Sequence, residues 1–303
     1  MKLYTDALSK GWKLTSKYPW LWLYGLFALL LSSNGGEFDF YFREVDTLTS
    51  LSQWQAGLEN FLSAFHGQWI VLLVLGVIFL VAVIIVVYFA VISQNSLIYA
   101  TGQKSSAQLT FPGVYNEARK FFWPSFGINL LAKCLILLIV TLLALPYIFW
   151  MNKYYLMIVI FLLIPIVLVI SFVTKYSINY LILKKENWQS AIKKAFILFK
   201  KNWLVSLEMA GIIFLLSLAL GLALMLVVGI IVAPALSSAI STAHYLVVLT
   251  DIFNVFFLAV LILIILMAIS AAIFSAWQWT SWSYLFQDFV EKPQESQLAK
   301  VFK

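Results

Sequence analysis

Charged residues are scarce in this sequence. Only 11% of its 303 residues are charged and 63% are hydrophobic, whereas a water-soluble domain has about 25% charged and about 45–50% apolar residues. A soluble fold of this length still exposes about a quarter of its chain surface to water, and this chain has too few polar residues to cover it. The composition excludes a water-soluble globular domain, and we expect an all-α integral membrane protein.

Cysteine and histidine are almost missing as well. Cys134 is the single cysteine, so no intramolecular disulfide or thiolate metal cluster can form; we expect a buried structural thiol. His66 and His244 are far apart in the sequence, and nothing in their spacing supports a metal site with Asp251. Glycine-rich phosphate loops, nucleophile elbows and HExxH motifs are absent from the sequence. We therefore expect no metal, no cofactor and no enzymatic activity.

Long apolar runs dominate the chain instead. A helix needs about 20 apolar residues to cross the hydrocarbon core. Six stretches reach or approach that length, at residues 18–33, 69–99, 124–149, 154–183, 204–232 and 245–286. The first is short, and we expect it to begin earlier, as a retained helix, because no small-residue cleavage pattern follows it. Six transmembrane helices are predicted.

Lysine and arginine are unevenly divided among the segments between these runs. Of the 20 basic residues, sixteen lie in the N-terminal segment, in residues 99–123, in residues 184–203 and in the C-terminal tail. The opposite loops hold only Arg43 and Lys153. Because basic loops stay in the cytoplasm, we expect a bacterial cytoplasmic membrane protein with both termini in the cytoplasm. This rule accounts for the net charge of +7, and we expect no nucleic-acid partner.

The segments before the first, third and fifth runs share a pattern. On a helical wheel with about 100° per residue, residues 3–18, 111–123 and 188–203 each form an apolar stripe with aromatic residues, opposite basic residues. In residues 3–18 the stripe consists of Tyr4, Leu8, Gly11, Trp12, Thr15 and Tyr18. This pattern is typical of helices that lie in the membrane interface. The basic residues predicted to contact lipid headgroups are Lys10, Lys13, Lys17, Arg119, Lys120, Lys193, Lys194, Lys200 and Lys201.

A threefold internal repeat follows from this pattern. Each unit would be one basic interfacial helix and a transmembrane hairpin, at residues of about 1–100, 101–183 and 184–286 within a single membrane domain, with a cytoplasmic tail at 287–303. The first unit has an outer insertion at about 34–68. Two interpretations of the basic helices remain open. They either merely bridge spans, or they bind the anionic inner leaflet, at about 1 kcal/mol per lysine.

Two parts of the chain resemble a known family. Residues 7–13 (ALSKGWK) with 17–22 (KYPWLW), and residues 187–196 (NWQSAIKKAF) with 201–203 (KNW), are similar to bacterial six-span membrane proteins. That family includes the membrane domain fused to some glycerophosphodiester phosphodiesterases, and stand-alone relatives. The resemblance covers nearly the whole chain and implies an inner-membrane protein with ties to lipids or the envelope. It does not imply phosphodiesterase activity, which belongs to a separate soluble domain.

Charged residues inside the expected spans are candidates for function, because each costs about 2.5–3.5 kcal/mol or more at the bilayer centre. There are four of them, namely Lys133, Lys175, Glu208 and Asp251. We hypothesise that Glu208 pairs with Lys133 or Lys175. In the alternative, Lys175 and Glu208 extend to the headgroups.

Polar neighbours accompany two of these charged residues. Asn129 lies one turn before Lys133, and Asn254 lies three residues after Asp251. Each pair could line a small polar cavity. Separately, Trp277, Trp279 and Trp282 are expected to form, with Tyr284, an interfacial aromatic belt at the cytoplasmic end of the last span.

These observations favour a non-enzymatic membrane protein that acts through contact with membrane lipids or as an envelope scaffold. A transporter or channel for a small or lipidic solute is the alternative, since transporters are often built from repeats, although few polar groups line the spans. A membrane-embedded lipid enzyme is disfavoured because no histidine and carboxylate residues cluster on one membrane face. A protein partner or a homo-oligomer is left open.

Overall fold

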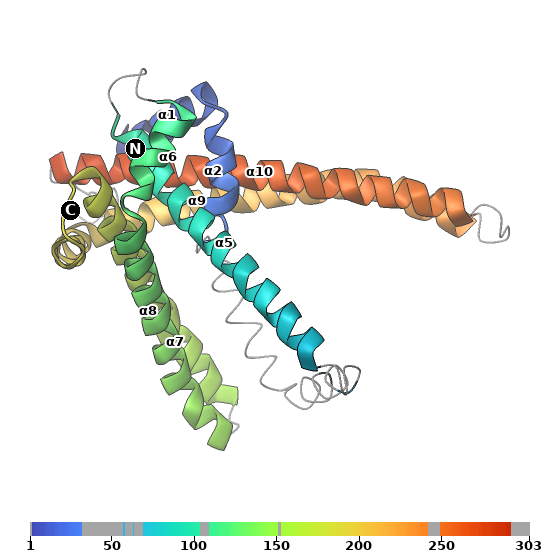
Figure 1. The fold of residues 1–303 in the computed structure, drawn as a ribbon, viewed down its shortest axis with the longest axis horizontal. Coiled ribbons are helices and arrows are strands. Elements are labelled where there is room, and N and C mark those ends of the chain that lie inside the picture. The colour runs from blue at the N-terminus through green and yellow to red at the C-terminus, as the bar shows by residue number, and fades with distance from the viewer. Residues whose placement is uncertain are drawn as a thin grey trace. The chain divides into compact units, whose positions relative to one another are not determined.

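The computed structural model describes residues 2–31, 57, 63, 69–103, 109–150, 153–241 and 249–291, and all regular structure within them is helical. In chain order (Figure 1) the helices are α1 (Lys2–Lys17), α2 (Leu21–Ala28), α5 (Trp69–Thr101), α6 (Phe111–Arg119), α7 (Phe122–Trp150), α8 (Lys153–Leu183), α9 (Trp188–Ser241) and α10 (Leu249–Glu291). The expectation of an all-α protein is confirmed for these residues.

Among the described residues, five helices are long and apolar enough to cross a membrane. The crossing segments are Trp69–Thr101, Phe122–Leu143, Phe161–Leu183, Trp188–Val227 and Val260–Glu291. The protein is therefore a multi-pass membrane protein. Of the first expected span, the described residues contain α2, whose 8 residues extend over about 12 Å, and turns that end at Leu31.

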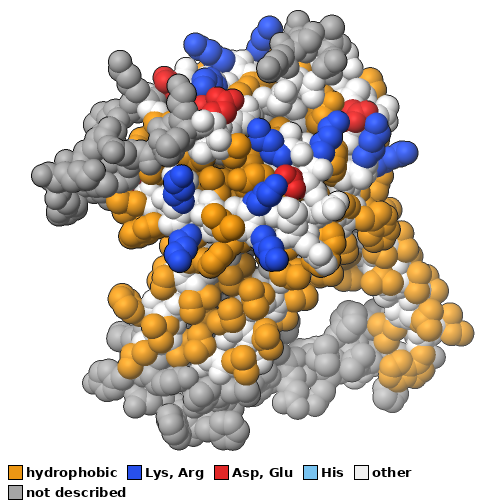
Figure 2. Space-filling model, turned by 90° about the vertical axis from the view of Figure 1, so that its left-hand side faces the viewer, with side chains coloured by type: hydrophobic (Ala, Val, Ile, Leu, Met, Phe, Trp, Pro, Cys, Tyr) orange, Lys and Arg blue, Asp and Glu red, His pale blue; other side chains and the backbone are white. Residues whose placement is uncertain are grey.

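The long helices carry their apolar side chains outward. Along the first two thirds of α5 nearly every side chain is exposed, with Ile70 at 80% and Phe79 at 71%. Figure 2 shows continuous areas of hydrophobic side chains, with lysine and arginine side chains grouped in one region of this face. Soluble proteins rarely expose apolar patches above a few hundred Å², so lipid must cover these surfaces. Cys134 is exposed on α7; the expected buried thiol is wrong, because an apolar side chain in lipid needs no protein cover.

All three segments predicted to lie at the interface are helical, and each ends at a bend. Residues 18–20 separate α1 from α2, and residues 120–121 separate α6 from α7. Within α9, Asn202 has non-helical backbone angles, with φ −123° and ψ 26°. The first fourteen residues of α9 are thus set off from the membrane-crossing part.

The chain forms two compact units, residues Met1–Leu26 with Lys200–Lys303, and residues Phe27–Phe199. In the first unit, α1 and α2 pack on the last third of α10. A Cβ atom on Gly11 would lie 3.0 Å from the backbone nitrogen of Ser281, and one on Gly25 would lie 2.8 Å from the Cβ of Ala276. The indole nitrogen of Trp277 donates to the carbonyl oxygen of Leu8 at 2.9 Å.

The second unit is built from α5, α6, α7, α8 and the start of α9. Ile136 of α7 packs with Leu163 and Val167 of α8, which joins these two helices as a hairpin. The side-chain nitrogen of Asn95 on α5 donates to the carbonyl oxygen of Ala118 on α6 at 3.4 Å. The small side chain of Ala118, fully buried, permits this approach between a side chain and the backbone of the neighbouring helix.

We predict that Gly25→Ala destabilises the protein, because the added methyl group meets α10. Overpacking of this kind costs about 1–3 kcal/mol. Gly127→Ala is the matched control, since a Cβ atom there has no neighbour within 4 Å. Thermal unfolding in detergent should give a midpoint lower by several degrees for Gly25→Ala and an unchanged or higher one for Gly127→Ala. Equal midpoints would contradict the close packing of α2 on α10.

Candidate functional site

The nine basic residues predicted to contact headgroups are all exposed. Three of them, one on each interfacial segment, form ion pairs with acidic residues: Lys10 with Asp288 at 3.6 Å, Lys120 with Glu117 at 2.5 Å, and Lys194 with Glu186. Among the described residues the other six form no ion pair. These six, which we call the open cations, are Lys13, Lys17, Arg119, Lys193, Lys200 and Lys201. They are the residues whose charge is available to a headgroup.

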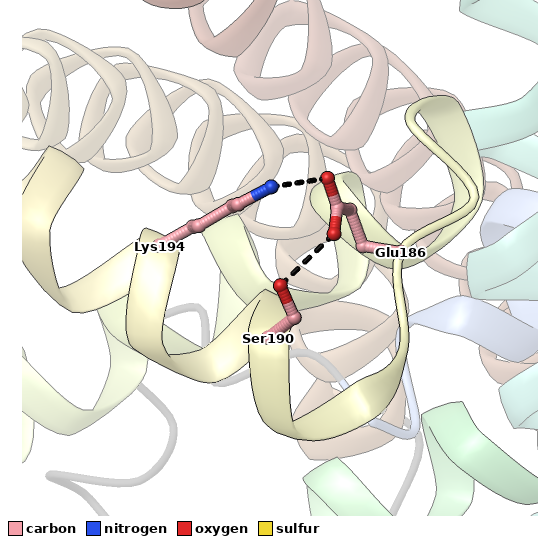
Figure 3. A network of polar contacts seen from close by, with 3 residues as sticks. All are labelled: Glu186, Ser190 and Lys194. Carbon is pink, nitrogen blue, oxygen red and sulfur yellow. Dashed lines mark hydrogen bonds and ion pairs between the residues drawn. The ribbon is translucent and has the colours of Figure 1, made fainter.

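The pair of Lys194 and Glu186 belongs to a small network at the start of α9 (Figure 3). The Glu186 carboxylate accepts hydrogen bonds from the Lys194 ammonium and from the Ser190 hydroxyl, the latter at 2.9 Å. Glu186 follows Lys185, whose φ of 52° is left-handed, and its backbone nitrogen donates to the carbonyl oxygen of Tyr180 at 3.4 Å. This is the geometry of a helix C-terminal cap. The cap places the Glu186 carboxylate next to the N-terminal end of α9, where the helix dipole favours negative charge.

The pKa of Glu186 lies below its ordinary value, because the carboxylate accepts hydrogen bonds from Lys194 and Ser190 and lies in the field of the Lys194 charge. Lys194 is thus held by a partner inside the chain. From the sequence, Lys193 and Lys194 are both predicted to contact headgroups, and their spacing does not indicate that only Lys194 is held by a carboxylate.

The buried face of the first interfacial helix differs from the expected stripe. Tyr4, Ala7, Gly11 and Thr15 are buried, whereas Trp12, placed in the stripe by the wheel, is 52% exposed. Small residues dominate the buried face because they allow the backbones of two helices to approach. A helical wheel groups apolar residues together and cannot separate those that face protein from those that face lipid.

The start of α9 is divided in the same way. Ala191 and Ala195 are fully buried, while Trp188, Phe196 and Trp203 are 47–53% exposed. On α6, Val114 and Ala118 are fully buried and Phe111 is 40% exposed. Each interfacial segment therefore has three sides: small residues against the protein, exposed aromatic residues, and exposed basic residues.

The expected aromatic belt at the end of α10 is largely wrong. Trp279 and Trp282 are only 4% and 2% exposed, and the Trp277 indole is hydrogen-bonded to α1. These rings pack inside the first unit, because α1 covers the helix end that sequence analysis placed in the headgroup region.

Asn129 is part of a buried polar cluster between α5 and α7. Its side-chain nitrogen donates to the side-chain oxygen of Gln94 at 2.9 Å and to the carbonyl oxygen of Ser125 at 3.1 Å. Lys133, one turn further along α7, is exposed, so the two residues face different surroundings. Gln94 was not among the predicted site residues, because its side chain is uncharged and the candidates within the spans were chosen by charge.

More polar atoms of this cluster are buried next to Gln94. Asn95 and Ser96 follow it directly on α5 and are fully buried, as is Ser125 on α7. Within the part of the chain that is described, the side-chain oxygens of these three residues have no hydrogen-bond partner. Such oxygens are costly to bury dry, so the cluster is a candidate site for water or a polar ligand.

Two further intramembrane candidates, Glu208 and Lys175, lie on α9 and α8. Glu208 accepts a hydrogen bond from the hydroxyl of Tyr4, a partner 204 residues away that no local pattern indicates. Lys175 is 8% exposed on α8. The pairing of Glu208 with Lys133 or Lys175 stays a prediction. Asp251 and Asn254 lie on α10, but their side chains lie outside the described part, as do His66 and His244.

Among the described residues, no three histidine, cysteine or carboxylate side chains are grouped as metal ligands. Comparisons with protein-family models, with curated proteins and with solved structures gave no match for the chain.

We predict that the Glu186 network stabilises the start of α9 in a pH-dependent way. A carboxylate with a lowered pKa in the folded state contributes stability above its unfolded pKa of about 4.3 and loses it as the pH falls through the folded value. The unfolding midpoint of the wild type should therefore exceed that of Glu186→Gln at pH 6–7, and the difference should shrink below about pH 4. A difference that stays constant down to pH 3 would contradict the assignment.

Proposed function

We propose that the protein is a non-enzymatic, six-span protein of a bacterial cytoplasmic membrane, with both termini in the cytoplasm, that acts through contact with anionic lipids or as an envelope scaffold. One observation carries this proposal. On each of three interfacial segments, open cations lie beside exposed aromatic residues, while small residues pack on the protein. Aromatic and basic side chains together favour the headgroup region.

The number of spans is supported by a contact within the first unit. Leu8 of α1 accepts a hydrogen bond from Trp277 near the end of α10, which favours the same side of the membrane for these two points. The chain between them would then cross an even number of times. Four candidate helices lie in that interval and the fifth contains Trp277, and the apolar run that includes α2 would supply the sixth crossing.

The second unit supports the same arrangement for one hairpin. A Cβ atom on Gly102, just after α5, would lie 2.8 Å from a terminal carbon of Leu183 at the end of α8. Of the helices between these points, α7 and α8 would each cross the membrane once. The ends of α5 and α8 would then share one side.

The threefold repeat is supported by equivalent packing. Each interfacial segment packs on the end of an even-numbered span: α1 on α10, α6 on α5, and the start of α9 on α8, where the rings of Phe199 and Phe172 stack at 5.7 Å. Each of these span ends carries a fully buried serine three residues before a tyrosine, namely Ser96 before Tyr99, Ser177 before Tyr180, and Ser281 before Tyr284. The resemblance to the bacterial six-span family is part of this proposal.

A transporter or channel is the second candidate, and the buried polar cluster of Gln94, Asn95, Ser96, Ser125 and Asn129 favours it. Unpartnered oxygens inside a membrane helix bundle often mark a hydrated path. Flux of ions, small solutes or fluorescent lipids across liposomes that contain the purified protein tests this candidate. Flux that Asn129→Leu abolishes would establish it over the scaffold function.

We predict that the open cations determine the retention of anionic lipid. Replacing all six by glutamine should reduce the ratio of phosphatidylglycerol to phosphatidylethanolamine that stays bound in native mass spectrometry, by about fivefold per charge at low salt, since each is worth about 1 kcal/mol. The control replaces the ion-paired Lys10, Lys120 and Lys194 by glutamine and should change the ratio much less. Equal ratios in both variants and the wild type would refute lipid contact through these residues.

We also predict the topology. In a Cys134→Ala background, Lys13→Cys and Glu291→Cys should react with a membrane-impermeant maleimide only after cells are permeabilised. Glu59→Cys, in the expected outer insertion, should react in intact cells. Labelling of Lys13→Cys and Glu291→Cys from opposite sides would exclude an even number of spans.

A further inference from the structure

A lysine and a tryptophan occur together at every bend between an interfacial segment and its span. The pairs are Lys17 with Trp20, Lys120 with Trp123, and Lys200 with Trp203, and in each the tryptophan follows three residues after the lysine. The intervening residues contain the bend in all three cases. The lysine thus belongs to the interfacial segment and the tryptophan to the start of the span.

The side chains at these bends are directed to the surroundings of the protein. All three lysines are exposed, Trp123 is 75% exposed, Trp203 is 53% exposed, and Trp20 is partly exposed. Neighbouring rings hold two of the indoles: Trp20 lies 5.9 Å from Tyr24, and Trp123 lies 5.2 Å from Phe122. Exposed but fixed aromatic rings are suited to contact with a ligand, because little side-chain freedom is lost on binding.

A second cation accompanies each pair. Lys13 lies one turn before Lys17, Arg119 directly precedes Lys120, and Lys201 directly follows Lys200. All three second cations are exposed and belong to the open cations defined above. Each bend therefore carries two basic side chains and one indole ring at the point where the chain turns from the interface into the membrane.

We propose that each bend is a discrete binding site for one anionic glycerophospholipid. The open cations of each bend neutralise the headgroup phosphate, and the indole ring packs on the glycerol and upper acyl chains. At the second and third bends the indole N–H of Trp123 or Trp203 donates a hydrogen bond to a phosphate or ester oxygen. This inference rests on the proposed contact with anionic lipids and adds stoichiometry and position to it: three sites, at the bends, rather than a diffuse attraction along the basic faces.

The three sites differ in charge, and this gives their order of strength. At the bend between α6 and α7, Lys120 is neutralised by Glu117 at 2.5 Å, which leaves Arg119 as the open cation. At the other two bends both cations are open among the described residues. Lipid should therefore bind most weakly at the bend between α6 and α7.

Native mass spectrometry of the full-length protein, titrated with dioleoyl phosphatidylglycerol, tests the proposal. The wild type should hold up to three phosphatidylglycerol molecules more tightly than any further ones. The double variant Lys200→Gln with Trp203→Phe should lose one of the three tight molecules, whereas the double variant Arg119→Gln with Trp123→Phe should mainly lose the weakest. Lys200→Arg alone should keep all three, because the charge remains.

The matched control lies on the same helix, away from the bend. Lys193 is an open cation and Trp188 is 47% exposed, so Lys193→Gln with Trp188→Phe removes the same groups and should keep three tight molecules. Equal loss in the control and in the bend variant would overturn the discrete sites while leaving diffuse lipid contact in place. A wild type that retains no phosphatidylglycerol would refute both. Unfolding midpoints of all variants, measured in parallel, show that lost binding does not reflect lost folding.

Discussion

The close contact between α1 and the end of α10 is the constraint on which the membrane topology depends. It exists because Gly11 has no side chain where α1 meets Ser281, so that the two backbones approach and Trp277 reaches the carbonyl oxygen of Leu8. In the topology that we propose, a contact of this kind keeps α1 and the end of α10 on one side of the membrane. Sixteen of the 20 basic residues lie in the segments that this topology assigns to that side. Because basic segments stay in the cytoplasm, we propose that this side is the cytoplasmic one.

Lipid as the solvent explains where packing is concentrated. The first two thirds of α5 are exposed and apolar, whereas its last third is buried and carries Ser93, Gln94, Asn95 and Ser96. Apolar side chains gain little by leaving lipid for protein, so helices associate through small residues and hydrogen bonds. The polar end of α5 supplies both through its contacts with Ala118 and Asn129. The same division holds on α10, where Ser281 and Thr280 are buried and Ile264 is exposed.

Periodicity and hydropathy in the sequence predicted the five long apolar helices and the helical structure of the three basic segments before them, because both signals depend on residues that are close in the sequence. They could not predict the partners of these segments. Tyr4 and Glu208 meet across 204 residues, and Trp277 reaches the carbonyl oxygen of Leu8 across 269 residues. The helical wheel also placed Trp12 and Gly11 in the same apolar stripe. In the structure Trp12 is exposed and Gly11 is buried. In a membrane an apolar residue has two suitable environments, and sequence alone does not select between them.

The division of lysines into paired and open ones bears on whether the basic helices only bridge spans or also bind lipid. Each interfacial segment has one lysine held by a carboxylate: Asp288, Glu117 or Glu186. Exposed ion pairs add little stability, about 0–1 kcal/mol, but they remove a charge from the surface and restrict the orientation of the helix. One ion-paired lysine on each segment is sufficient for a helix that only bridges two spans. The open cations serve no such contact in the described residues, yet they remain exposed on the same segments as the aromatic residues. We infer that bridging and lipid contact are carried by different lysines of the same helices.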